Sequence, residues 1–211
     1  KPDSSVYYWQ FVASDEGVAE DRNLPPPVSR ELLVEQMRNF AAGRGAEGWL
    51  GLRAQLAFTD SKSGIADGKI DSEDIKDCIS RWGVGLGEVY LDEIIDQFGG
   101  GEDILSYREF LSSLRGPISN GRREILEKLF SEMAGTDAVV PMEVFTKFLN
   151  PESHPLAYFG GYSAADVQSH IVDAFNAKGV TMDAFVDYFS DIAVVADDEY
   201  FEGTVRNVLQ L

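Results

Sequence analysis

An internal repeat with four copies constrains the fold of this chain more than any other feature. Each copy reads as an entering helix that ends in Phe, a short loop with one β-prone residue, and an exiting helix whose first turn holds Phe or Ile. Apolar residues recur at helical spacing on both sides of each loop. The loops cover residues 59–74, 99–109, 134–144 and 176–184, and their β-prone residues are Ile70, Leu105, Val140 and Val180.

Paired loops of this kind exchange short strand hydrogen bonds, so we expect Ile70 to face Leu105 and Val140 to face Val180. This layout is that of an EF-hand protein. The predicted fold class is all-α: two lobes of paired EF-hands, built from four helix–loop–helix units with short loop–loop β pairing, plus an extended N-terminal arm. The first entering helix is expected over about 46–58, running through Trp49, Leu52, Leu56 and Phe58.

Changes in composition along the chain predict three segments. Residues 1–28 form the arm, residues 29–116 the first lobe with hands 1 and 2, and residues 117–211 the second lobe with hands 3 and 4. The arm contains the stretch "SSVYYWQFVAS" and then a stiff Leu-Pro-Pro-Pro spacer at 24–27. Its aromatic side chains are too apolar to remain in water, so we expect them to contact the body of the protein or a protein partner. These candidate partner-binding residues are Tyr7, Tyr8, Trp9 and Phe11.

The chain is strongly acidic, because 36 Asp and Glu residues against 18 Lys and Arg residues give a net charge of -18. A phosphate backbone would be repelled, so nucleic acid is not an expected partner. Such a surface suits cations or a basic protein partner, and solubility alone is the alternative. No apolar run approaches the roughly 20 residues that span a bilayer, so an integral membrane protein is not expected. The single cysteine, Cys78, excludes an internal disulfide and fits a reducing compartment.

The first loop, "SGIADGKIDSED", is the best candidate for calcium. An EF-hand loop supplies oxygen ligands from positions 1, 3, 5, 7, 9 and 12, with glycine at position 6. When Ile70 takes position 8, Gly68 takes position 6, but Ser63 and Ile65 take positions 1 and 3. A start at Asp60 instead lengthens the loop. The candidate ligands, for a weak or lost calcium site, are Asp60, Asp67, Asp71 and Asp74.

The other three loops have lost more of the ligand pattern. The second keeps Glu109 in the final position, but it begins Gly-Gly-Gly-Glu-Asp at 99–103 and is short. The third offers only Asp137 and Glu143. The fourth is short as well and carries Lys178, whose ammonium group would repel a dication. We therefore expect no cofactor at these loops, and calcium is an alternative at the first loop alone.

Three stretches carry a resemblance to a known family: "RGAEGWLGLRAQLAFTD" at 44–60, "EFLSSLRGPIS" at 109–119, and "GVTMDAFVDYFSDIAVVADDEYFEGTVRNVLQL" at 179–211. Together they resemble calcyphosin, and the similarity covers about residues 29–211. Calcyphosin-like proteins are calcium-binding, non-enzymatic EF-hand proteins with signalling roles, and some occur in cilia. At that family's metal-binding positions, this sequence carries ligand types only at Asp60, Asp67, Asp71, Asp74 and Glu109.

Three hypotheses for function follow, from different classes. An enzyme is not expected, and no catalytic residue is predicted. The stretch "GVGLG" at 83–87 lacks the preceding strand that a dinucleotide-binding site requires. Neither His154 nor His170 has a Cys or a second His at metal-ligand spacing. We favour a non-catalytic structural or interaction subunit of a larger protein assembly. The alternative is a calcium sensor or regulator that uses the first loop.

The expected location is the cytoplasm, with a ciliary or cytoskeletal complex as the specific case. The sequence starts at Lys1, which is typical of a processed or partial chain, so an imported organellar protein stays open as the alternative.

Overall fold

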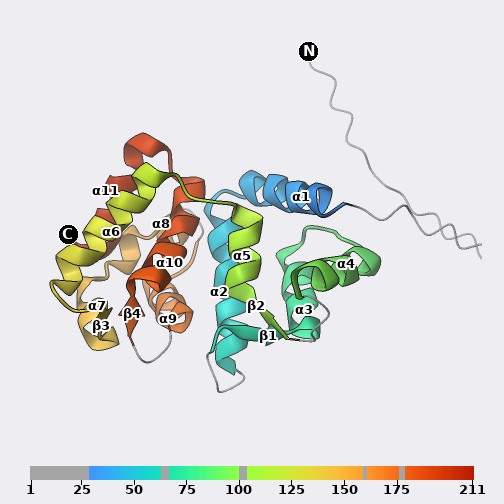
Figure 1. Ribbon diagram of the computed structural model, residues 1–211, viewed down its shortest axis with the longest axis horizontal. Helices are drawn as coiled ribbons and strands as arrows, with labels where there is room; N and C mark the ends of the chain where they lie inside the picture. Colours follow the sequence, from blue (N-terminus) through green and yellow to red (C-terminus); the bar gives the residue numbers. More distant parts are fainter. Residues whose placement is uncertain (1–28, 63–66, 100–103, 159–160, 176–178) are drawn as a thin grey trace, which may run out of the picture.

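The computed structural model describes residues 29–62, 67–99, 104–158, 161–175 and 179–211, whose arrangement is shown in Figure 1. The first half of the chain contains α1 (Arg30–Gly43), α2 (Ala46–Lys62), β1 (Lys69–Asp71), α3 (Ser72–Trp82), α4 (Glu88–Gly99), β2 (Ile104–Ser106) and α5 (Tyr107–Arg115). The second half contains α6 (Asn120–Ala134), β3 (Val139–Val140), α7 (Met142–Phe148), a 3-10 turn (Pro151–Ser153), α8 (Pro155–Tyr158), α9 (Ala164–Ala174), β4 (Val180–Thr181), α10 (Met182–Val195) and α11 (Asp198–Leu209).

The predicted all-α fold is confirmed. The helix–loop–helix units are α2–β1–α3, α4–β2–α5, α6–β3–α7 and α9–β4–α10. Strand β1 pairs antiparallel with β2, and β3 pairs antiparallel with β4. Ile70 lies opposite Leu105 and Val140 opposite Val180, as the repeat predicted.

Side chains that accept a backbone hydrogen bond fix the start of most helices. Each of these caps accepts from the N–H of the residue three positions later, at 2.8–3.3 Å. The capping residues are Ser29, Asp71, Ser106, Ser119, Ser163 and Thr181. Asp71, Ser106 and Thr181 are also the last residues of their strands, so one residue ends the strand and begins the exiting helix. A cap of this kind contributes about 1 kcal/mol to stability.

Two glycines permit close backbone approaches that any side chain would block. A Cβ atom at Gly179, where φ is +113°, would lie 2.7 Å from the carbonyl oxygen of Val140 on the paired strand. A Cβ atom at Gly48 would lie 2.1 Å from the carbonyl oxygen of Ala41, where α1 turns into α2. The indole N–H of Trp82 donates to the carbonyl oxygen of Gly48 at 3.0 Å and ties α3 to this junction.

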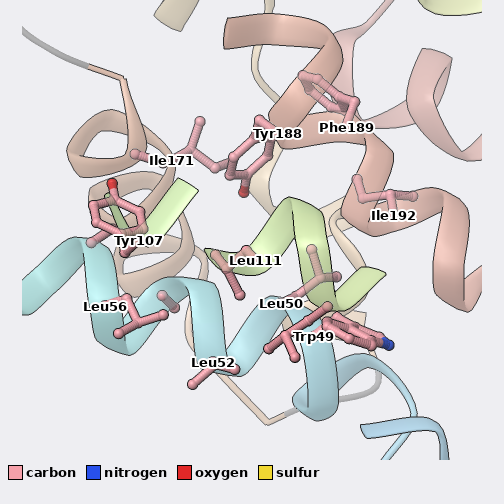
Figure 2. Close-up of a cluster of buried hydrophobic side chains, with 14 of the residues drawn as sticks. Trp49, Leu50, Leu52, Leu56, Tyr107, Leu111, Ile171, Tyr188, Phe189 and Ile192 are labelled. Carbon is pink, nitrogen blue, oxygen red and sulfur yellow. The ribbon is translucent and has the colours of Figure 1, made fainter. Parts of the chain in front are cut away.

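Helix α2 lies at the centre of the molecule and packs against both halves of the chain (Figure 1). It contacts α1 and α3 on one side and α9 and α10 on the other. Figure 2 shows Leu52 and Leu56 of α2 in one cluster with Leu111 of α5 and with Ile171 and Ile192 of the second half. Apolar residues therefore lie on all sides of α2, as in a buried helix.

Phe58 is the exception within this helix, because its side chain is 45% exposed. Phe58 lies within α2, as predicted, but its side chain is turned toward solvent. The helix continues to Lys62, whose ammonium nitrogen lies 4.3 Å from the centre of the Phe58 ring. A cation over an aromatic face stabilises a ring that the core does not cover.

The predicted boundary between the two lobes, at 116/117, falls in the segment between α5 and α6. The predicted arm, with Tyr7, Tyr8, Trp9 and Phe11, lies outside the described residues. Within the described ranges, no helix has the length and apolar character needed to cross a bilayer.

Candidate functional site

Asp60 closes the first loop from the last turn of α2. Its side chain is almost completely buried, and Oδ2 accepts a hydrogen bond from the N–H of Gly68 at 2.9 Å. Gly68 has φ +84°, which suits glycine, and it lies just before β1. Burial raises the pKa of Asp60, and the N–H groups of Gly68 and Asp67 oppose this rise. The carboxylate therefore holds the turn that leads into the strand.

Two of the remaining predicted ligands of the first loop, Asp67 and Asp71, accept hydrogen bonds from nearby backbone N–H groups. Oδ1 of Asp67 accepts from the N–H of Lys69 at 3.0 Å, and Oδ1 of Asp71 accepts from the N–H of Asp74 at 2.8 Å. Within the part of the chain that the structure describes, no three His, Cys, Asp or Glu side chains form a group that could hold a metal ion. Ser63 and Ile65 lie outside it. The described residues by themselves thus do not fit a calcium cage, and the four-Asp site stays a prediction.

A guanidinium group from the neighbouring unit lies against this loop, and sequence reasoning missed it. Nε of Arg108 is 3.5 Å from the position that a Cβ atom would take at Gly68. The same residue borders a hollow of about 380 Å³ beside the loop, and its Nη2 donates to the carbonyl oxygen of Ala174 at the end of α9 at 2.8 Å. Its positive charge lowers the pKa of Asp60, although less than burial raises it. A fixed cation at this place disfavours a dication nearby.

The other three loops contribute little that could bind an ion. The two acidic residues of the third loop, Asp137 and Glu143, are exposed. In the second loop, the N–H of Glu109 donates to the Ser106 cap at 3.3 Å, so this residue forms part of the first turn of α5. The stretch 100–103 and Lys178 fall outside the described residues.

Four charged side chains form a buried ion-pair network between the two halves of the chain. Arg53 comes from α2, Arg115 from the end of α5, and Asp187 and Asp191 from one face of α10. Nη2 of Arg53 lies 2.9 Å from Oδ2 of Asp187, and Nη2 of Arg115 lies 3.2 Å from Oδ1 of the same carboxylate. Both guanidinium groups also donate to Asp191. Each carboxylate is therefore shared by two arginines.

The network is mostly buried and its formal charges cancel, although the side chain of Asp187 is 24% exposed. The side chain of Asp191 is 0% exposed and that of Arg53 is 3% exposed. Burial alone would raise the pKa of Asp187, but the charges of Arg53 and Arg115 outweigh it and lower that pKa below its usual range. The carboxylates of Asp191 and Asp187 raise the pKa of Arg53 against the opposing effect of burial. Asp187 and Arg53 therefore both remain ionised at neutral pH.

A buried histidine extends this polar centre. The ring of Tyr188 lies between Arg53, whose guanidinium carbon is 5.7 Å from the ring centre, and His154, whose Nε2 is 3.2 Å from the Tyr188 hydroxyl oxygen. Nδ1 of His154 accepts from the N–H of Leu156 at 3.2 Å, which places the proton of the neutral ring on Nε2. Burial, with a smaller effect of His170, lowers the pKa of His154 to about 3. His154 is therefore a neutral structural residue.

A signal for the network was present in the sequence. Arg53 interrupts the apolar stretch "WLGLRAQLA", and the two aspartates lie four residues apart within the apolar stretch "FVDYFSDIA". Charges within buried helices require partners. The periodicity of single helices does not reveal which helices meet, so the pairing itself could not be derived.

No protein-family model matches the sequence. The chain is similar to the crustacean calcium-binding protein 23 of Faxonius limosus, with 24% identity over 181 residues that cover 82% of this chain and 88% of that protein. That relative is named as a calcium-binding protein. The similarity and the four helix–loop–helix units agree with an EF-hand-like calcium-binding type of protein, without singling out calcyphosin.

Proposed function

We propose that this chain is a non-catalytic EF-hand-type protein, held in one arrangement, that acts as a structural or interaction subunit of a larger protein assembly. The observation that carries the proposal is the buried network of Arg53, Arg115, Asp187 and Asp191. A calcium sensor works because ion binding changes the angle between the entering and exiting helices of a unit. Here one network joins the entering helix of the first unit to the exiting helices of the second and fourth.

The energies favour a locked arrangement over a switch. Displacing α2, α5 or α10 would leave a buried charge without its partner, which costs about 3–5 kcal/mol. One calcium site at a hundred times its dissociation constant supplies about 2.7 kcal/mol. A single damaged loop therefore supplies less free energy than the displacement requires.

A calcium-binding sensor or regulator that uses the first loop is the second candidate. Two observations favour it: the hydrogen bond from Gly68 to Asp60 preserves the turn of the loop, and the relative in Faxonius limosus is named a calcium-binding protein. The proposed ligands are Asp60, Asp67, Asp71 and Asp74.

The proposed partner is a basic protein surface, which the net charge of -18 supports. The proposed compartment is the cytoplasm, including its cytoskeletal and ciliary complexes. Support for it comes from the resemblance to calcyphosin and from the single cysteine, Cys78, which is buried and free.

Calorimetric titration with calcium and then magnesium, together with thermal unfolding with and without a chelator, tests the proposal. The variant Asp60→Asn serves as the control, because its amide oxygen can still accept from Gly68 while the charge is lost. We expect no micromolar binding heat and the same melting temperature with and without chelator for both proteins. A site with a Kd of about 10 μM would add about 2.7 kcal/mol at about 1 mM calcium and raise the melting temperature by roughly 5–11 °C. That shift, abolished by Asp60→Asn, would overturn the locked arrangement in favour of the sensor.

A further inference from the structure

A hollow of about 750 Å³ lies between the two halves, where the junction of α1 and α2 meets the junction of α10 and α11. We call it the inter-half groove. Its apolar and aromatic lining residues come from both halves of the chain: Ala42, Trp49, Pro155, Val194, Ala196 and Tyr200. Tyr200 is 63% exposed and Val194 is 41% exposed, so apolar surface that could bind a ligand remains open to solvent.

The charges at the groove favour an uncharged occupant. Arg44 lies 3.8 Å from the carboxylate of Glu47, and its Nη1 donates to the carbonyl oxygen of Trp82. The other charged lining residue is Asp197, next to the start of α11. Arg44 is already paired, so the groove offers no free cation for an anionic ligand among its lining residues. A basic ligand would meet only one unpaired acid there.

The chain contains a segment that matches this surface. Residues 4–14, "SSVYYWQFVAS", carry no charged side chain although the whole chain has a net charge of -18. The segment includes Tyr7, Tyr8, Trp9 and Phe11. Aromatic side chains bury roughly 150–250 Å² each, which makes them strong anchors in apolar hollows.

The chain between this segment and α1 is also long enough to reach from the start of α1 to the groove. Helix α1 has 14 residues and is therefore about 21 Å long, and the groove lies at its C-terminal end, at Ala42. Residues 12–28 separate Phe11 from Ser29, and a chain of that length can span at most about 60 Å, which is more than the length of α1. A short tether that can span two sites makes their contact intramolecular, with an effective concentration in the millimolar range.

We propose that the inter-half groove binds the aromatic segment Tyr7–Phe11 of its own chain. The millimolar effective concentration exceeds that of a second copy at ordinary protein concentrations, so the contact forms within one molecule. The bound segment spans both halves and adds to the contact that the Arg53 network makes. This inference goes beyond the proposed function and does not depend on it.

Fluorescence of Trp9 in the full-length chain tests the proposal. Subtracting the spectrum of Trp9→Leu isolates the Trp9 signal from those of Trp49 and Trp82. The groove variant is Ala42→Glu, and the matched control is Leu32→Glu, at an exposed site on the same helix that does not line the groove. Circular dichroism checks that both variants fold.

We expect Trp9 in the parent chain to be protected from acrylamide quenching, to remain protected in Leu32→Glu, and to become accessible in Ala42→Glu. A tenfold loss of intrinsic affinity would lower the bound fraction from about nine tenths to about half. Equal protection in the two variants, or a fully accessible Trp9 in the parent chain, would overturn the proposal. Protection that rises with protein concentration over about a hundredfold range would show binding by a second copy, and would overturn it as well.

Discussion

Removal of one charge from the buried network should destabilise the whole molecule. Arg53→Met keeps a long side chain of similar width but removes the guanidinium group that contacts Asp187 and Asp191. The formal charge of the network then changes from zero to minus one around a side chain that is 0% exposed. Breaking a buried pair in this way costs about 3–5 kcal/mol, which for a chain of this length lowers the melting temperature by roughly 6–20 °C.

The assay is urea unfolding at neutral pH, followed by circular dichroism. A matched surface control is Arg206→Met, because Arg206 lies 3.0 Å from Glu132 and 2.9 Å from Glu202 with 27% of its side chain exposed. Exposed pairs contribute about 0–1 kcal/mol, so this variant should change the free energy of unfolding little.

A double variant separates charge imbalance from lost packing. Arg53→Met combined with Asp191→Leu leaves Arg115 and Asp187 as a balanced pair. The loss of unfolding free energy in the double variant should be smaller than the sum of the losses in the two single variants, by about 1–3 kcal/mol. If Arg53→Met costs no more than Arg206→Met, or if the single effects simply add, the network does not hold the halves together and the locked arrangement loses its support.

Three further changes test other parts of the fold. Gly179→Ala should cost about 1–3 kcal/mol, since its Cβ atom would collide with the carbonyl oxygen of Val140, whereas Gly121→Ala, with open space around it, should be neutral or slightly stabilising. Asp71→Ala should cost about 1 kcal/mol by removing the cap of α3, and Asp71→Asn should retain most of that stability; chemical denaturation measures both. Burial lowers the pKa of His154 to about 3, so unfolding takes up a proton at this residue below its ordinary pKa of about 6.5. The stability linked to His154 is therefore complete above pH 6.5 and is lost as the pH falls toward 3. Relative to His154→Gln, the parent chain should lose about 2 kcal/mol between about pH 7.5 and pH 5, and an equal pH dependence in both proteins would contradict this reasoning.

The fold could be predicted from the sequence because its signals are local. Helical spacing around each loop located the helices, and one β-prone residue per loop fixed the pairing of Ile70 with Leu105. The end of α2 differs from the prediction, because the helix continues past Phe58 to Lys62. Helix α2 is apolar on all sides because the second half covers it, so its apolar residues do not define a single face.

The candidate site could be predicted only in part. Asp60 and Asp71 were identified as loop residues, and the structure gives both a role in closing the loop. Arg108 and the partners of Arg53 depend on contacts between residues that lie far apart in the chain, from 66 to 138 positions. The periodicity of a single helix does not reveal contacts with other helices. The only sequence signal for the network was the presence of Arg53, Asp187 and Asp191 inside apolar stretches.

The acidic residues of the first loop have a structural explanation that does not involve an ion. Asp60 holds the turn at Gly68, and Asp71 ends β1 and caps α3 with the same carboxylate. A loop that binds no metal still needs a turn, a short strand and a helix start, and these two side chains provide them. Acidic composition is thus weak evidence for calcium in a loop of this kind. The position of Arg108 is stronger evidence, and it counts against calcium binding. Its guanidinium group lies against Gly68, where its positive charge disfavours a second cation.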